Sequence, residues 1–173
     1  MTKNLRVKSS EYIDETNRIS FKFNGKTYHG FKGDTLASAL LANDVHLVGR
    51  SFKYHRPRGI MTSGSEEPNA IVQVNPGTNR TEPNVRATEV EIYEGLEASS
   101  QNCWPSVEFD IGGINNFLSP FFPAGFYYKT FMWPASFWEK YEFFIRHSAG
   151  LGKSPTSSAV SYTHLTLPTT NSV

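Results

Sequence analysis

The sequence predicts an α+β domain followed by an aromatic-rich, partly helical connecting segment. Three observations lead to this prediction: a hairpin signature at residues 18–30, a helical pattern directly after it, and thirteen aromatic residues crowded into residues 117–144. The chain has 173 residues, of which 38% are hydrophobic, so it is long enough to bury a core.

Two strands are expected first. Residues 18–23 alternate between apolar and polar types, and residues 26–30 form a second strand-like run. Asn24-Gly25 lies between the two runs, and this pair favours the positive φ angles of a type I′ turn. We therefore expect the two strands to pair antiparallel.

A helix is expected after the hairpin. Asp34 or Thr35 can cap its start, apolar residues recur at helical spacing over residues 36–41, and Asn43-Asp44 ends it. The order of strand, strand and helix is the opening of a β-grasp domain.

Two further strand-like runs, at residues 70–74 and 89–93, can join the hairpin in a mixed sheet that covers this helix. We expect the domain to occupy residues 16–98, after an N-terminal arm at residues 1–15.

A basic loop, residues 49–60, lies between the helix and the third strand. It contains four permanent cations, one histidine and two aromatic residues. Such a loop suits a phosphate or carboxylate, because guanidinium groups bind both through paired hydrogen bonds. Two interpretations stay open: contact with a cofactor, substrate or partner, or salt bridges within the fold. The candidate contact residues are Arg50, Lys53, His55, Arg56 and Arg58.

Composition excludes several classes of protein. Cys103 is the only cysteine, so the chain alone cannot form a disulfide, a cysteine-based zinc site or a four-thiolate cluster, and we expect no metal site. Cys103 is expected to be a small buried residue without chemistry. The net charge is only +1, but residues 1–60 hold eleven Lys/Arg against five Asp/Glu. We expect this basic half to be a solvated face or a subunit contact, and no nucleic-acid partner. The start of the chain lacks the apolar run of a secretion signal, which predicts a cytoplasmic protein.

Residues 99–153 hold the aromatic cluster. Prolines, glycines and charges interrupt it, which argues against a membrane span. Residues 134–147 predict a helix with Pro134 at its start, Arg146 and His147 at its end, and glycines beyond it. We interpret residues 99–153 as a connecting or interface segment that packs across other domains or subunits, with an ordinary compact core as the alternative.

The end of the chain looks foreign to the fold. Residues 160–169 read as the in-frame translation of a transposase-end sequencing adaptor, and all ten codons agree. We expect residues 160–173 to be an artefact of this kind, and the native protein to continue beyond the truncation.

The run GRSFKYHRPRGI at residues 49–60 resembles the loop that precedes the cluster-binding cysteines in ferredoxin-like β-grasp domains of amine-oxidising flavoenzymes. The next run, MTSGSEEPNA, contains no thiol. Thr62, Glu66 and Asn69 cannot replace a set of thiolates, so the resemblance implies a ferredoxin-like domain without its cluster. Nearly all of residues 15–153 resembles the alpha subunit of heterotetrameric sarcosine oxidases.

This resemblance implies a function for the whole complex. The family oxidises sarcosine, or a related secondary amine, to glycine, hydrogen peroxide and a one-carbon unit that passes to tetrahydrofolate. Its cofactors are FAD, FMN, NAD and tetrahydrofolate, and the amine is oxidised at a flavin in the beta subunit. No catalytic residue maps onto this chain, so we expect it to bind no cofactor alone and to act in assembly.

The implied partners are the other subunits of a heterotetramer and the remainder of the alpha subunit. The alternative is a stand-alone β-grasp interaction module that binds an acidic partner through the basic loop. A ferredoxin-type electron carrier is nearly excluded, because the thiols are missing.

Overall fold

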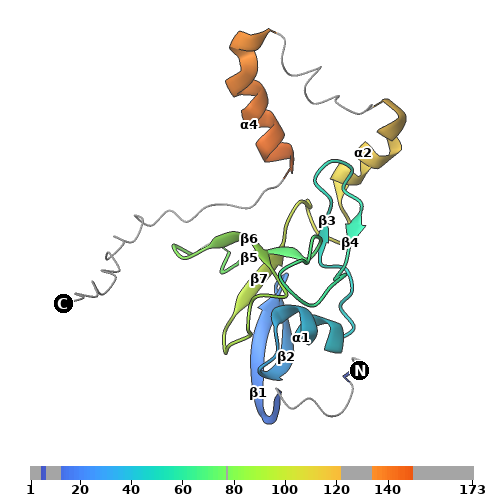
Figure 1. The fold of residues 1–173 in the computed structure, drawn as a ribbon. Coiled ribbons are helices and arrows are strands. Elements are labelled where there is room, and N and C mark those ends of the chain that lie inside the picture. Colours follow the sequence, from blue (N-terminus) through green and yellow to red (C-terminus); the bar gives the residue numbers. More distant parts are fainter. Residues whose placement is uncertain (1–4, 7–12, 77, 122–133, 150–173) are drawn as a thin grey trace, which may run out of the picture.

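The computed structural model of the chain describes residues 5–6, 13–76, 78–121 and 134–149 (Figure 1). The adaptor-like tail at 160–173, the aromatic residues within 122–133 and the glycines expected to end the last helix lie outside these ranges.

The chain begins its folded part with a hairpin. Strand β1 (Asp14–Phe23) pairs antiparallel with β2 (Lys26–Lys32), in a register that places Phe23 opposite Lys26. Asn24 and Gly25 have φ angles of 50° and 76°, as a type I′ turn requires. The hairpin prediction is confirmed.

Helix α1 (Leu36–Ala42) follows the hairpin, as expected. The Thr35 side chain caps its start by accepting a hydrogen bond from the Ser38 amide, and Asn43 ends it. Of the two candidate caps, Thr35 therefore performs this role. The Asp34 carboxylate is fully buried, and it accepts hydrogen bonds from Arg6 and from the Ser38 hydroxyl.

Three more strands complete a five-stranded sheet in the order β2-β1-β7-β5-β6. The added strands are β5 (Ile71–Val74), β6 (Glu82–Arg86) and β7 (Glu97–Ser100). β7 runs parallel to β1 and antiparallel to β5, and β5 pairs antiparallel with β6. The mixed sheet and α1 together form the α+β, β-grasp-type domain that the sequence predicts. The strand expected at residues 70–74 is present as β5.

The prediction of a strand at residues 89–93 is wrong. Within it, only Glu91 makes a bridge, to Thr35. The Leu36 amide donates to the Val90 carbonyl, and the Ile92 amide donates to the Asp34 carbonyl. The apolar residues alternate because Val90 and Ile92 pack into the core beside the start of α1, whereas the backbone stays outside the sheet.

The core lies between α1 and one face of the sheet (Figure 1). Leu36 and Leu40 of α1 are completely buried, and Phe21, Phe23 and Val72 of the sheet are at most 2% exposed. Burial of side chains of this size is worth about 1.5–3 kcal/mol each before the entropy cost. This core fixes the sheet from which the functional loops extend.

In both edge strands, β2 and β6, some backbone groups are not free to pair with a further strand. At β2, the Asn43 side-chain amide donates to the His29 carbonyl, and the Asp34 carboxylate accepts from the Phe31 amide. The Phe31 carbonyl also accepts a hydrogen bond from the Asp34 amide. At β6, Pro83 has no amide hydrogen to donate.

Short elements follow the sheet. They are η1 (Ile111–Gly113), α2 (Ile114–Phe117), η2 (Ser119–Phe121), η3 (Ala135–Phe137) and α4 (Trp138–Ala149). The helix expected from Pro134 onward is therefore present, and Figure 1 shows α4 away from the sheet. In the described part of the chain, no helix has the length and hydropathy needed to cross a membrane.

Candidate functional site

A two-stranded ribbon positions the basic loop. Strand β3 (Gly49–Arg50) pairs antiparallel with β4 (Pro57–Arg58), and residues 51–56 form the turn between them. The Ser51 amide donates to the Arg56 carbonyl at 2.9 Å, and the His55 amide donates to the Ser51 carbonyl at 3.0 Å. His55 has a φ of 52°, so it sits in the left-handed region. These bonds fix the backbone of the turn that carries the cations.

Arg50 points inward and braces the backbone. Its Nε donates to the Val107 carbonyl at 2.8 Å, and its two terminal nitrogens donate to the carbonyls of His55 and Glu108 at 3.1 and 3.2 Å. Three backbone acceptors from two segments therefore share one guanidinium. This geometry holds the turn of the basic loop against residues 107–108.

His55 also points inward. Its Nδ1 lies 2.7 Å from Oδ2 of Asp110, and both side chains are buried. The other carboxylate oxygen of Asp110 accepts from the amides of Trp104 and Gly112 at 3.0 and 3.1 Å. A Cβ at Gly112 would lie 2.3 Å from the His55 ring, so a residue without a side chain is needed there. The pair fastens the basic loop to residues 104–112.

Lys53, Arg56 and Arg58 point outward, and we call them the surface cations. Lys53 and Arg56 each lie 4.9 Å from the centre of the Tyr54 ring. Arg56 donates to the Asn116 side chain at 2.8 Å, and Arg58 donates to the Asn69 side chain at 2.9 Å. Both acceptors are neutral. Within the described residues, no carboxylate forms a salt bridge with a surface cation.

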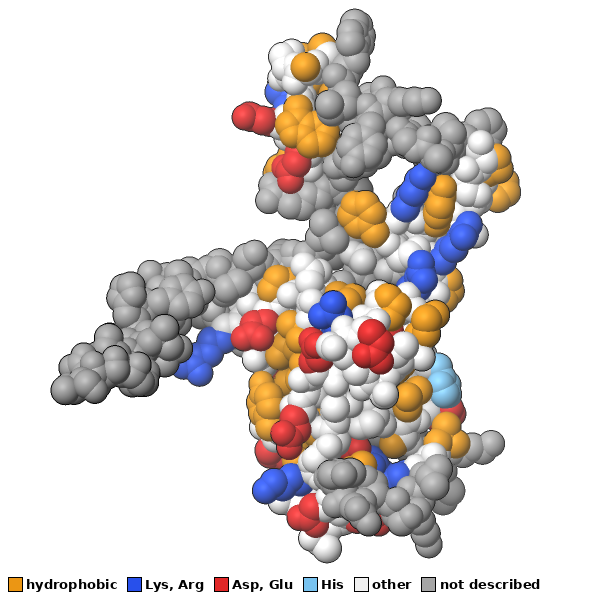
Figure 2. Space-filling view, in the orientation of Figure 1, with side chains coloured by type: hydrophobic (Ala, Val, Ile, Leu, Met, Phe, Trp, Pro, Cys, Tyr) orange, Lys and Arg blue, Asp and Glu red, His pale blue; other side chains and the backbone are white. Residues whose placement is uncertain are grey.

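Exposed apolar side chains accompany these cations. Figure 2 shows Lys and Arg side chains beside hydrophobic ones at the end of the molecule that carries β3, β4 and α2. Trp104, Phe109 and Phe117 are 69%, 70% and 83% exposed. Arginine and aromatic residues are enriched in protein interfaces, so this surface has the composition of a docking face.

The next loop, residues 61–70, is organised by an acid, and we call it the carboxylate loop. Glu67 is 1% exposed. One carboxylate oxygen accepts from the amides of Met61 and Thr62 at 2.8 and 2.6 Å and from the Thr62 hydroxyl at 3.2 Å. The other oxygen accepts from the amides of Asn69 and Ala70 at 2.7 and 3.1 Å. The carboxylate thus joins the two ends of the loop.

The charge of Glu67 is stabilised despite its burial. Burial raises the pKa of this carboxyl, but hydrogen bonds from the backbone amides of Thr62, Asn69, Met61 and Ala70 outweigh that effect and lower the pKa from 4.5 to about 2. Glu67 is therefore an anion at neutral pH.

The residues present do not fit an iron–sulfur cluster. The carboxylate loop has no thiol, and its centre holds Glu67. Burial and the nearby charge of Asp110 raise the pKa of the Cys103 thiol to about 11, so this single sulfur stays protonated. Among the residues that the structure describes, no group of three or more His, Cys, Asp and Glu side chains could hold a metal ion.

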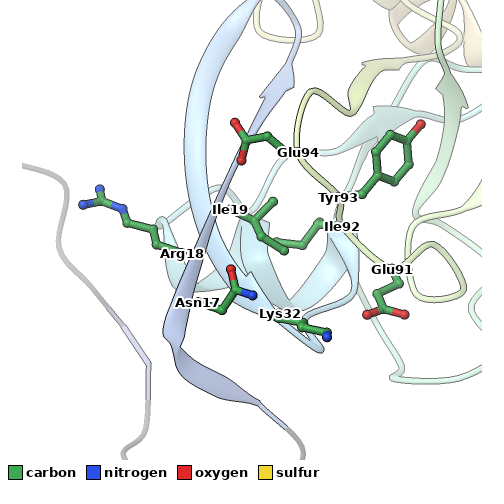
Figure 3. A pocket seen from close by; sticks show the side chains of 8 residues that line it. All are labelled: Asn17, Arg18, Ile19, Lys32, Glu91, Ile92, Tyr93 and Glu94. Atoms are coloured by element: carbon green, nitrogen blue, oxygen red, sulfur yellow. The ribbon is translucent and has the colours of Figure 1, made fainter.

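A separate open groove of about 650 Å³ runs between β1 and residues 91–94 (Figure 3). Ile19 and Ile92 face each other at its centre, whereas the Arg18 side chain points away from it. Polar groups do not converge inside this groove as they do in ligand sites, so we assign it no function.

The structure separates residues that the sequence grouped together. Arg50 and His55 brace the loop, whereas the surface cations face solvent. Sequence reasoning missed Asp110 and Glu67. Asp110 lies 55 positions from its partner His55, and Glu67 follows another glutamate, Glu66, so no local pattern marks either residue.

Comparison with known proteins gives consistent results. Residues 16–103 match the family described as "2Fe-2S iron-sulfur cluster binding domain". The chain is 63% identical over 150 residues to sarcosine oxidase subunit alpha of Rhizobium meliloti (strain 1021), a match that covers 86% of this chain and 15% of the relative. It is 37% identical over 89 residues to sarcosine oxidase subunit alpha of Corynebacterium sp. (strain U-96), covering 50% of this chain and 9% of that one.

Among solved structures, L-proline dehydrogenase from P. horikoshii is similar with a TM-score of 0.40 and 23% identity, over 52% of this chain and 16% of that chain. The chain spans about 15% of the length of the Rhizobium relative. By its sequence, the chain belongs to the 2Fe-2S iron–sulfur cluster binding domain family, as a homologue of sarcosine oxidase subunit alpha.

Proposed function

We propose that this chain is the N-terminal part of the alpha subunit of a sarcosine-oxidase-like complex, and that it contributes to assembly. The observation that carries the proposal is the 63% identity to the Rhizobium subunit over 150 residues. That relative is named as a subunit, so it works together with other chains. The proposed partners are the other subunits of a heterotetramer and the rest of the alpha subunit.

The proposed reaction of the complex is the oxidation of sarcosine, or a related secondary amine, to glycine and hydrogen peroxide, with a one-carbon unit passed to tetrahydrofolate. We assign FAD, FMN, NAD and tetrahydrofolate to the other parts of the complex. The buried polar groups of this domain support that division, because His55, Asp110 and Glu67 hold loops together. A cytoplasmic location stays a prediction.

We assign docking to the surface cations. Three positive side chains within six residues repel one another, and within the described part of the chain their partners are neutral side-chain amides or an aromatic ring. A partner surface with carboxylates or a phosphate removes that repulsion and adds charge-assisted hydrogen bonds. Arg50 and His55 then act as positioning residues, because they fix the turn that presents the cations.

The test is co-expression of the uninterrupted gene with its genomic neighbours, with purification through a tag on this subunit. We expect further subunits, flavin and nicotinamide dinucleotide to copurify. The double variant Arg56→Ala/Arg58→Ala should reduce copurification. The matched control is Arg18→Ala/Lys32→Ala, which removes two exposed cations from the hairpin and should have no effect.

Two results would contradict the proposal. Equal copurification with both double variants would remove the docking role of the basic loop. A reading frame that stops directly after this domain, together with a purified chain that binds an acidic protein without flavin, would instead establish the stand-alone interaction module.

A further inference from the structure

The carboxylate loop is fixed by bonds that do not involve the Glu67 carboxylate. The Thr88 hydroxyl donates to the Gly64 carbonyl at 2.8 Å, and the Ala87 amide donates to the Ala70 carbonyl at 2.8 Å. Arg86 donates from Nε to the Glu67 main-chain carbonyl at 3.2 Å. The loop backbone is therefore tied to residues 86–88 independently of what fills its centre.

Four backbone amides converge inside this loop. Those of Met61 and Thr62 come from one side, and those of Asn69 and Ala70 come from the other. Converging backbone amides make concave anion sites, and such sites hold phosphates and iron–sulfur clusters in other proteins. In this member of a cluster-binding family, the same kind of site surrounds an oxygen anion.

We propose that residues 61–70 form an anion cradle for a carboxylate, in which the side chain of Glu67 is the resident ligand in place of a metal cluster. The cradle requires negative charge as well as volume. A neutral amide of the same size presents an NH₂ group to one pair of backbone donors, and those donors then lack an acceptor.

The vacant cradle should accept an external carboxylate of the right size. Glu67→Ala keeps Cβ and removes one carbon and the carboxyl group, and acetate contains the same atoms with its methyl in the place of Cγ. Because the loop is tied down by Thr88, Ala87 and Arg86, the amides should remain close to their positions in the variant. Acetate should therefore bind in the place of the missing Glu67 carboxylate.

The experiment measures unfolding of the 173-residue chain at pH 7 by chemical denaturation. Glu67→Ala should lower the folding equilibrium constant by at least about tenfold, the scale of a lost charge-assisted hydrogen bond. Sodium acetate should restore stability with saturation. Acetamide, the neutral isostere, and sodium chloride at equal ionic strength should restore much less. The control is Glu66→Ala, at the exposed neighbouring glutamate, which should lose little and gain nothing from acetate.

Equal recovery with acetate, acetamide and chloride, or no recovery of a folded Glu67→Ala, would overturn the proposal. Should Glu67→Ala fail to fold, Glu67→Gln decides the matter. A Glu67→Gln protein as stable as the wild type at pH 7 would show that the loop needs no charge, and a Glu67→Gln protein at least about tenfold less stable would support the cradle.

Discussion

Two adjacent loops direct their charged side chains oppositely, one towards solvent and the other into the domain. The basic loop directs Lys53, Arg56 and Arg58 to the surface, where their described acceptors are neutral. The carboxylate loop directs Glu67 inward, where five donors surround it. A buried charged group that makes all its hydrogen bonds within the domain stabilises that domain. A charged group at the surface that still has hydrogen-bond donors to offer can bind another molecule.

The same division exists within the basic loop. Arg50 donates hydrogen bonds to three backbone carbonyls of its own chain, whereas Arg58 donates to one neutral side chain. Two arginines eight positions apart therefore differ in role, although the sequence presents them alike. The comparison predicts which substitutions act on stability and which act on assembly.

The largest effect on folding stability should come from lowering the pH. Because the pKa of Glu67 falls from 4.5 to about 2 on folding, the folded state binds fewer protons than the unfolded state between these values. Stability contributed by Glu67 is therefore complete above about pH 4.5 and is lost as the pH falls towards about 2, by up to about 1.4 kcal/mol per pH unit. Urea unfolding of the wild type and Glu67→Gln from pH 7 to pH 2 checks this. Parallel pH profiles for the two proteins would contradict it.

The second effect concerns the inward arginine. Arg50→Ala should destabilise the chain by about 2–3 kcal/mol, because the partly buried carbonyls of Val107 and His55 and the exposed carbonyl of Glu108 lose a charged donor. Arg56→Ala, in the same loop but at the surface, should cost less than about 0.5 kcal/mol. Thermal and chemical unfolding of both variants measures the difference. Equal losses would mean that the distinction between inward and outward cations is false.

The third effect is smaller and should appear only in the proposed complex. Arg58→Lys keeps the charge but loses the planar fork of donors. We expect assembly with the other subunits to weaken by up to about fivefold, while the stability of the isolated chain changes little. Analytical gel filtration of co-expressed subunits provides the measurement. Destabilisation of the isolated chain with assembly unchanged would instead make Arg58 an internal brace.

The last prediction is that reconstitution with iron and sulfide leaves the chain unchanged. Anaerobic reconstitution with iron and sulfide should leave the purified chain colourless, because the carboxylate loop has no thiol and Cys103 stays protonated. Iron and acid-labile sulfide assays check this expectation. Stoichiometric iron with a charge-transfer spectrum would contradict the prediction that this chain holds no cluster.

Local signals predicted the first half of the fold well. Asn24-Gly25 fixes its turn by its own backbone preferences, and Thr35 caps α1 through a contact three residues away. Non-local pairing was harder to predict. β7 is a short polar run that pairs with β1 across more than seventy residues, and β6 contains a proline, so neither carries a strand pattern. The run at 89–93 has the pattern but packs beside α1.

The candidate site followed the same rule. Composition was enough to identify the basic loop, because cations are dense in residues 50–58. The direction of each side chain depends on partners far away in sequence, such as Asp110 for His55 and Val107 for Arg50. Glu66 and Glu67 have the same side chain, and only the three-dimensional course of the loop makes the second one its centre.

The modified sheet edges have a consequence for how this domain behaves outside a larger protein. An exposed strand with free amides and carbonyls recruits strands from other molecules and starts aggregation. At β2, side chains from Asp34 and Asn43 already occupy backbone groups of Phe31 and His29, and at β6 a proline interrupts the row of donors. Neither edge offers a continuous template, so strand addition from a second copy is disfavoured at both ends of the sheet.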